Sequence, residues 1–390
     1  MSSAQMHGAP RPAILRLIPP PGRVVGLRYI WVMPFDQRAE PVIHTTVRPY
    51  RAVGLWLFAM CGMILVMVVL GGATRLTGSG LSIMEWAPIM GTLPPLGDAE
   101  WQRLFKLYQR IPQYELLHAG FGIDGFKQIF WLEWTHRLWG RLIGLAFAVP
   151  LFWFAVRRQL PPGLWPRLLG LLVLGGLQGA VGWFMVASGF EADSTAVSPW
   201  RLVMHLALAL SLYAALLWTA LDVWRSGRPR PAASAFVGRA SAWLVGAVAL
   251  TIVAGGFVAG LKAGLTYNTF PLMDGHLVPR GYSVLQPWAR NLFENVAAVQ
   301  FDHRLLASLT ATLALALAAW GLLQRPRGPV RAALLALAVV VVVQYALGVT
   351  TLLWVVPVGL ATAHQATAVL LLTAALVLRH LTRAPSSQVS

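Results

Sequence analysis

VGLWLFAMCGMILVMVVL, residues 53–70, carries no charged side chain over 18 consecutive residues. About 20 apolar residues in a helix span the hydrocarbon core of a bilayer. Apolar runs recur along the chain, for example at residues 332–343. The 390 residues are 57% hydrophobic and 12% charged, whereas a soluble domain is about one-quarter charged. The sequence therefore predicts an all-α integral membrane protein.

The alternation of apolar runs and polar loops predicts about eight transmembrane helices. We place them near residues 52–73, 133–156, 168–187, 202–222, 241–262, 301–323, 333–354 and 361–380. Residues 1–50 are rich in proline and arginine and lack the apolar core of a secretory signal. We expect them to form a basic, disordered cytoplasmic arm.

The net charge of +17 follows the predicted topology. Basic residues gather in the arm, in three alternate loops near 157–167, 225–239 and 325–331, and near 379–383, whereas the opposite loops hold nearly all the acids. Positive charge is retained on the cytoplasmic side of bacterial membranes. This predicts that both termini lie in the cytoplasm, or in the matrix if the protein is mitochondrial. The weak transit-peptide signal favours the bacterial inner membrane, and the mitochondrial inner membrane is the alternative. Because the charge is explained by topology, we do not expect a nucleic-acid partner.

An internal duplication organises the chain. LGGATRLTGSGL at residues 70–81 resembles AGGFVAGLKAGL at 254–265, an offset of 184. His136 corresponds to His303 at an offset of 167, and His205 to His364 at 159. Duplicated halves that differ in loop length give such shrinking offsets. We expect two pseudo-symmetric four-helix bundles, residues 51–224 and 241–381, joined by a basic linker at 225–240 and followed by a tail at 382–390.

Four histidines stand at the outer ends of predicted spans, two in each half. Ionisable side chains at membrane depth are costly and mark functional sites. Two neutral imidazoles from facing helices can hold both axial positions of a haem iron. This predicts metal ligands at His136 and His205 in the first half, and at His303 and His364 in the second. Four cations at the same level could contact haem propionates: Arg137, Arg304, Arg75 and Lys262.

Glu133 breaks the symmetry of the two halves. It precedes His136 by three residues, so both side chains face the same way on a helix. Its counterpart is Gln300, which cannot act as a base. We expect chemistry in the first half and a fixed redox cofactor in the second. The alternative is that Glu133 is solvated or pairs with Arg137.

Other conspicuous residues have simpler interpretations. Gln178 and Gln344 are predicted to form hydrogen bonds between helices, and Cys61, the only cysteine, is predicted to pack in the core. Apolar residues at helical spacing in 100–111 predict an amphipathic helix, either a membrane anchor or a lid. The remaining histidines are predicted to be solvated surface residues: His7, His44, His118, His276 and His380.

Several motifs together resemble the haem A synthase family. They are GGATRLTGSGLS (71–82), EWTHRLWGR (133–141), YNTFPLMDG (267–275) and FDHR (301–304), with His205 and His364. The resemblance covers roughly residues 50–380. It implies an oxidoreductase that acts on the methyl group of haem O and converts it to a formyl group, with water as the oxygen source, for use in terminal cytochrome oxidase. The cysteine pair that some members carry in the first outer loop is absent from this sequence.

The same resemblance implies the roles of the site residues. His303 and His364 would ligate a resident haem b, His136 and His205 would flank the substrate haem, and Glu133 would be the functional carboxylate. Haem O and membrane lipid are the expected partners, with haem O synthase and cytochrome oxidase assembly factors as further candidates. Two other functions remain open at this point: a dihaem b-type electron-transfer cytochrome, and a transporter with duplicated halves.

Overall fold

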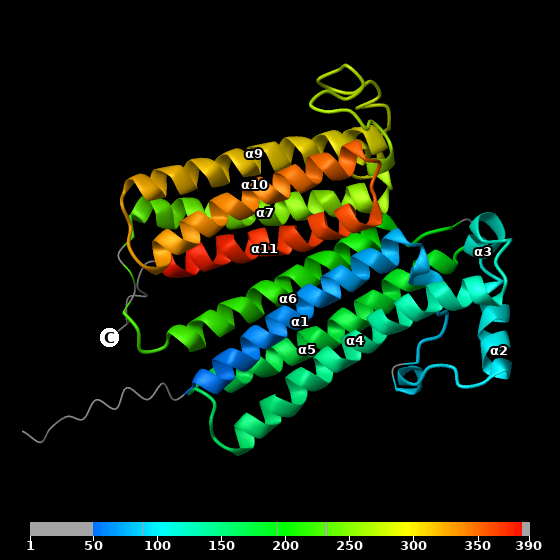
Figure 1. Ribbon diagram of the computed structural model, residues 1–390, viewed down its shortest axis with the longest axis horizontal. Coiled ribbons are helices and arrows are strands. Elements are labelled where there is room, and N and C mark those ends of the chain that lie inside the picture. The colour runs from blue at the N-terminus through cyan, green and yellow to red at the C-terminus, as the bar shows by residue number, and fades with distance from the viewer. Residues whose placement is uncertain (1–49, 88, 193, 230, 232, 384–390) are drawn as a thin grey trace, which may run out of the picture. The chain divides into compact units, whose positions relative to one another are not determined.

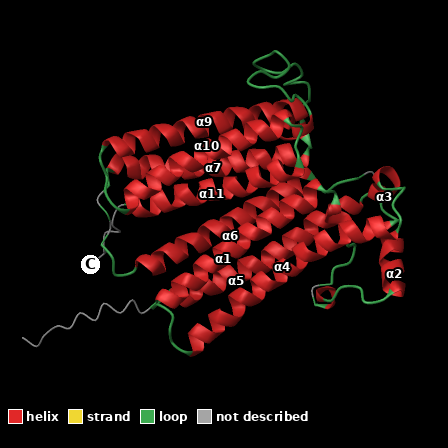
Figure 2. Ribbon diagram, in the orientation of Figure 1, coloured by secondary structure: helices red, strands yellow, loops and turns green. Residues whose placement is uncertain are grey.

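The computed structural model describes residues 50–383 except 88, 193, 230 and 232. The predicted arm, apart from Tyr50, and most of the tail lie outside the described residues. Within them the chain forms helices and loops and no β-strand, and eight helices are long and apolar enough to cross a membrane (Figure 2). The predicted all-α membrane fold is confirmed.

Each half contributes four long helices. In the first half they are α1 (Arg51–Leu76), α4 (Ile123–Val156), α5 (Leu164–Ala187) and α6 (Pro199–Arg225). In the second half they are α7 (Ala235–Gly260), α9 (Val296–Leu323), α10 (Pro329–Leu353) and α11 (Val358–Thr382). Most bounds fall within a few residues of the predicted spans, but α4 begins ten residues before the predicted residue 133.

Local sequence explains several helix starts. Proline occupies the first position of α6 and α10, where its missing N–H has no helical partner to lose. The Asn295 side chain caps α9 by accepting hydrogen bonds from the N–H groups of Ala297 and Ala298. These starts matter because the histidines of α6, α9 and α11 lie within the first two turns of their helices.

The long helices of each half form a ring of four. In the first half, α1 and α5 each pack against both α4 and α6, so α4 and α6 occupy opposite corners. In the second half, α7 and α10 each pack against α9 and α11, which occupy opposite corners in the same way (Figure 1). The halves contact one another through α1 with α11, α6 with α7, and α6 with α11. The histidine-bearing helices are therefore the diagonal pair of each ring.

The loop between α1 and α4 and the loop between α7 and α9 lie at the same end of the helices (Figure 1). The first contains α2 (Asp98–Tyr108) and α3 (Pro112–Leu117). The predicted amphipathic helix is present as α2, but its apolar face packs against Phe126 and Phe130 in the extension of α4. The interpretation of this helix as a lipid anchor is wrong, because that face is covered by protein.

Candidate functional site

The four predicted histidine ligands form two pairs across the rings. His136 on α4 lies within electrostatic reach of His205 on α6. His303 on α9 has the same relation to His364 on α11. Each pair joins the diagonal corners of one ring, so its two imidazoles come from opposite helices and not from a shared helix surface.

A glycine on a neighbouring helix packs against each imidazole. A Cβ added at Gly71 would lie 3.2 Å from Nε2 of His136, and one at Gly255 would lie 2.9 Å from Cε1 of His303. Both glycines belong to the repeated Gly-Gly motifs and differ by the same offset of 184. Any larger residue there would force the imidazole to move.

The second member of each pair has the same arrangement. A Cβ at Gly182 on α5 would lie 2.9 Å from Cε1 of His205, and one at Gly348 on α10 would lie 2.9 Å from Cε1 of His364. Their offset is 166, the offset that relates Gln178 to Gln344. These four glycines were not predicted as site residues from the sequence, although their recurrence in both halves was a signal.

Hydrogen bonds fix the orientation of some of these rings. The Nδ1 of His303 lies 3.2 Å from the carbonyl oxygen of Thr251, to which it can donate, which leaves Nε2 as the free nitrogen. The Gln178 amide lies 3.1 Å from Nδ1 of His205 and donates to the His205 carbonyl at 3.0 Å. The predicted interhelical role of Gln178 is thus confirmed. The Nδ1 of His364 and the Oε1 of Gln344 are buried with no hydrogen-bond partner among the described residues.

The donor set fits a haem better than a bare metal ion. Among the described residues, no three histidine, cysteine or acidic side chains group closely enough to hold a metal. A haem iron needs only axial ligands from the protein, because the porphyrin supplies the other four. Two facing imidazoles at the centre of an apolar four-helix ring match that requirement.

Glu133 is buried at 2% exposure beside the first histidine pair. One carboxylate oxygen accepts hydrogen bonds from the Ser82 hydroxyl at 2.7 Å and the Ile83 N–H at 2.9 Å. The other accepts from Nη2 and Nε of Arg137 at 2.6 and 3.0 Å. Glu133 is therefore not solvated, and the alternative of an ion pair with Arg137 describes its geometry.

Arg137 also fastens the loop that follows α1. Its guanidinium donates to the carbonyl oxygens of Ile83 at 2.5 Å and Glu85 at 3.1 Å and lies over the Trp183 ring. The Glu85 carboxylate accepts two hydrogen bonds from Arg103 of α2, which hold the pKa of Glu85 below its usual value. The loop is thus fixed both by Arg137 of α4 and by Arg103 of α2.

The second half repeats this anchor with an amide in place of the carboxylate. Gln300 donates to the carbonyl oxygens of Ala263 and Thr266 at 2.7 and 2.6 Å and accepts from Arg304 at 2.9 Å. Arg304 donates in addition to the carbonyl oxygens of Tyr267 and Thr269. The propionate contacts expected of Arg137 and Arg304 stay predictions, because most of their N–H groups already bind loop carbonyls.

The other conspicuous residues have varied outcomes. His380 is not a surface residue: it is 4% exposed, and its Nε2 lies 2.9 Å from the Asp222 carboxylate of α6. His118 is partly buried, hydrogen-bonds Tyr108 and stacks on Phe121. Cys61 packs in the core as predicted. His7 and His44 lie outside the described residues.

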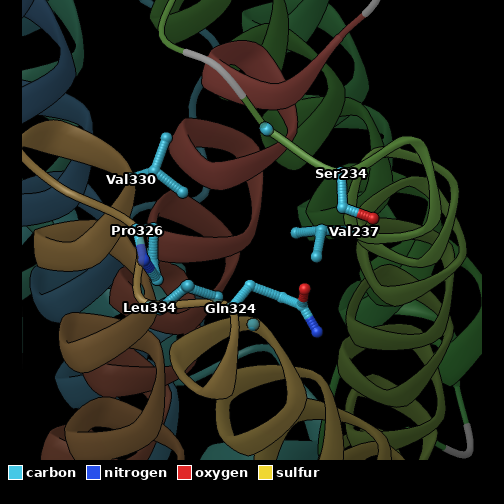
Figure 3. Close-up of a pocket in the computed structure, with 8 residues that line it drawn as sticks. Ser234, Val237, Gln324, Pro326, Val330 and Leu334 are labelled. Atoms are coloured by element: carbon cyan, nitrogen blue, oxygen red, sulfur yellow. The ribbon is translucent and has the colours of Figure 1, made fainter.

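A hollow of about 250 Å³ lies in the second half near the start of α7, the end of α9 and the start of α10. Ser234, Val237, Gln324 and Leu334 are among its lining residues (Figure 3). Gln324 follows α9 at a distance of 21 residues from His303, roughly 30 Å along a helix. The hollow is therefore remote from the histidine pairs.

Comparison with known proteins identifies similar chains. The family model described as cytochrome oxidase assembly protein (COX15-CtaA) matches residues 54–376. A protein of Granulibacter bethesdensis named Heme A synthase is 63% identical over 329 residues, covering 84% of this chain and 86% of that protein. A protein of Azorhizobium caulinodans with the same name is 50% identical and covers 85% of this chain and 94% of that protein. Another, of Nitrosospira multiformis, is 47% identical and covers 85% of this chain and 93% of that protein.

Proposed function

This chain belongs to the cytochrome oxidase assembly protein family, and we propose that it is a haem A synthase. It converts the methyl group of haem O to the formyl group of haem A, which is used in terminal cytochrome oxidase. Relatives named Heme A synthase, similar over more than four-fifths of this chain, support the activity. Two facing histidine pairs within one membrane protein support haem as the group on which it acts.

The difference between Glu133 and Gln300 carries the assignment of the two halves. Both residues lie three positions before a histidine, and both hydrogen-bond an arginine one turn later and the same segment of the preceding loop. Only the first half has a carboxylate at this position. We therefore assign the substrate haem to His136 and His205, and a resident haem b to His303 and His364.

Haem b at the second pair would supply one-electron redox chemistry to the reaction. The residues of the first half position the substrate and handle protons. His136 and His205 hold the substrate haem in place, while the glycines behind them restrict the tilt of each ring. Glu133 lies one helical turn from His136 at the outer end of this ring.

The proposed reaction takes its oxygen from water. Each hydroxylation replaces one methyl hydrogen by a hydroxyl group from water and releases two protons, together with two electrons that must pass to an external electron acceptor. Two such steps give a geminal diol, and loss of water gives the aldehyde. Glu133 can accept a proton from the attacking water or stabilise the electron-deficient carbon, as a positioned carboxylate does in general-base catalysis.

Glu133→Gln tests the catalytic role. The amide keeps the size of the side chain and its oxygen can still accept from Arg137, but its NH2 group then faces the Ile83 N–H. Haem b content and the thermal midpoint are therefore measured beside activity, to show that the variant is folded. We expect haem A formation from haem O to fall by a factor of roughly 10² to 10⁴. Glu115→Gln, the same change at an exposed acid of α3, is the control and should leave turnover near the parental value. A parental rate for Glu133→Gln would reduce Glu133 to a loop anchor.

Pigment extraction and mass analysis of the purified protein distinguish the three functions. Haem A synthase yields haem b together with haem O or haem A. A dihaem electron-transfer cytochrome yields two unmodified haems, and a transporter retains none. The proposed location is the bacterial inner membrane with both termini in the cytoplasm, because the basic loops lie at the end of the helices opposite α2 and α3. Haem O synthase and cytochrome oxidase assembly factors are the proposed protein partners.

A further inference from the structure

The second half has a hydrogen-bonded lock between α9 and α10, whereas α4 and α5 of the first half meet through Arg137 with Trp183 and through Phe152 with Trp165. The Ser308 hydroxyl of α9 lies 2.9 Å from the Tyr345 hydroxyl of α10, and the two groups share a hydrogen bond. The Phe270 ring packs edge-on against Tyr345 from the loop above. This lock ties the two helices together five residues beyond His303.

The equivalent positions in the first half are Arg141 on α4 and Gly179 on α5. They follow from the offsets of 167 and 166 that relate the histidines of α4 and α9 and the glutamines of α5 and α10. Arg141 donates to the carbonyl oxygen of Ala87 in the outer loop at 2.8 Å. A Cβ placed at Gly179 would have no atom within 4 Å. Where Tyr345 joins two helices, the first half therefore has open space.

This open space adjoins the first histidine pair. Gly182 and Gln178, on either side of Gly179, both contact His205. Trp183, one turn after Gly179, meets Trp86 of the outer loop and the Arg137 guanidinium of α4. Gly179 therefore lies on the side of α5 that turns from His205 towards α4.

Two further residues describe the surroundings of this space. Gly175, one turn inward from Gly179, also has no neighbour within 4 Å, whereas its counterpart Val341 is 2% exposed. The Oε1 of Gln178 is buried and has no hydrogen-bond partner among the described residues. The first half thus lacks the side chains that fill these positions in the second half, while the unsatisfied amide oxygen recurs at Gln344.

An apolar loop segment lies beside Arg141 of α4, where a Cβ at Gly91 would lie 2.9 Å from Nη2. Residues 89–96 contain no charged side chain and expose Ile89, Met90, Leu93 and Leu96 by 67–85%. Arg141, which holds this loop at Ala87, lies eight residues after Glu133 on α4, about 12 Å further along the helix. The segment therefore descends beside α4 towards the hydrocarbon region, where exposed apolar side chains are stable.

We propose that the substrate haem reaches His136 and His205 sideways from the bilayer, through the seam between α4 and α5. The hydrogen bond between Ser308 and Tyr345 closes the corresponding seam of the second half and retains its haem. The proposal rests on the assignment of the substrate to the first half. It gives that assignment a physical basis, because a porphyrin can exchange only where two helices can let it pass.

The first experiment blocks the seam after the protein has folded. In a Cys61→Ala background, Gly179→Cys is purified and labelled with a bulky maleimide. Gly170→Cys is the matched control: it also has open space, and nine residues at 100° each place it on the opposite side of α5. The readout is uptake of haem O from phosphatidylethanolamine–phosphatidylglycerol vesicles, followed by absorbance, which needs no turnover.

Labelled Gly179→Cys is expected to take up haem O roughly tenfold more slowly than the unlabelled protein, while labelled Gly170→Cys keeps the unlabelled rate. Equal uptake by labelled and unlabelled Gly179→Cys would overturn the proposal. Because uptake is measured without catalysis, a protein that takes up haem O through the seam and forms no haem A would refute the proposed function alone.

The second experiment opens the closed seam. Tyr345→Gly removes both the ring and the hydroxyl, whereas Tyr345→Phe removes only the hydrogen bond. Transfer of haem b to apomyoglobin is expected to accelerate roughly tenfold in Tyr345→Gly and less in Tyr345→Phe. Haem b loss from Tyr345→Gly at the parental rate would show that this contact does not retain the haem.

Discussion

Gly255→Ala should weaken haem b binding in the second half without unfolding the protein. The new methyl group would lie 2.9 Å from Cε1 of His303, about half an ångström closer than ordinary van der Waals contact between carbons. The ring cannot move away freely, because its Nδ1 hydrogen-bonds the Thr251 carbonyl on the same helix as Gly255. The imidazole must therefore turn, and its Nε2 no longer points into the interior of the four-helix ring.

The magnitude follows from two opposing contributions. Overpacking of this kind costs about 1–3 kcal/mol, and replacing glycine by alanine inside a helix gains up to about 1 kcal/mol. The net loss of fold stability is thus at most about 3 kcal/mol, and about 2 kcal/mol when the full helix gain is realised. A disturbed ligand orientation lowers metal affinity by about 10–100-fold, so haem loss should greatly exceed the loss of stability.

The assay compares haem b content per protein, and its rate of transfer to apomyoglobin, with the thermal midpoint of the apoprotein. Gly246→Ala is the matched control on α7, because a methyl group there meets nothing within 4 Å. It should keep haem b and gain slightly in stability. Gly71→Ala should spare haem b and reduce haem O uptake. If Gly255→Ala retained haem b as well as the parental protein, the view that this glycine fixes the orientation of His303 would be refuted.

Two further predictions concern the ends of the helices. Burial lowers the pKa of His118 below its usual 6.5, so the folded state favours the neutral ring. The neutral ring contributes fully to the stability of the fold above pH 6.5, and this contribution is lost as the pH falls below 6.5. The protection factors of residues 98–122, which are exchange rates corrected for the intrinsic pH dependence, should fall between pH 7.5 and pH 5.5. His118→Phe, which cannot titrate, should remove this difference, and the same difference in His118→Phe would contradict the assignment. Asp222→Asn weakens the contact of α6 with His380 and Arg383. The free energy of unfolding should fall by about 2 kcal/mol, which is measured as a lower thermal midpoint. An unchanged midpoint would show that these contacts contribute little.

The spans were predictable because their signal is local. An apolar run must be about as long as the bilayer is thick, so the eight predicted segments coincide with the long helices to within a few residues at most ends. The exception is the start of α4. Its first ten residues lie outside the predicted span, and Phe126, Ile129 and Phe130 are buried there against α2. Hydropathy indicates which residues lie within the membrane. It does not indicate that a helix extends beyond the membrane to pack against another helix.

His380 shows the same limit for a single residue. Its position near the basic end of the last helix is typical of a solvated side chain. In the structure it is buried against Trp218 and Asp222 of α6. The two helices are far apart in sequence, and nothing in the local pattern of α11 indicates that an acid from α6 will lie beside it.

The sequence by itself determined the membrane fold, the duplication and the four histidines, because hydropathy and repetition are properties of the chain read in order. It also identified Glu133 as the position where the halves differ. Only the tertiary structure decided what surrounds these residues: the glycine behind each imidazole, the arginine and loop that hold Glu133, and the hydrogen bond that joins α9 to α10 where α5 has Gly179. Each of these depends on which distant side chains meet, and that is decided by the packing of helices into rings.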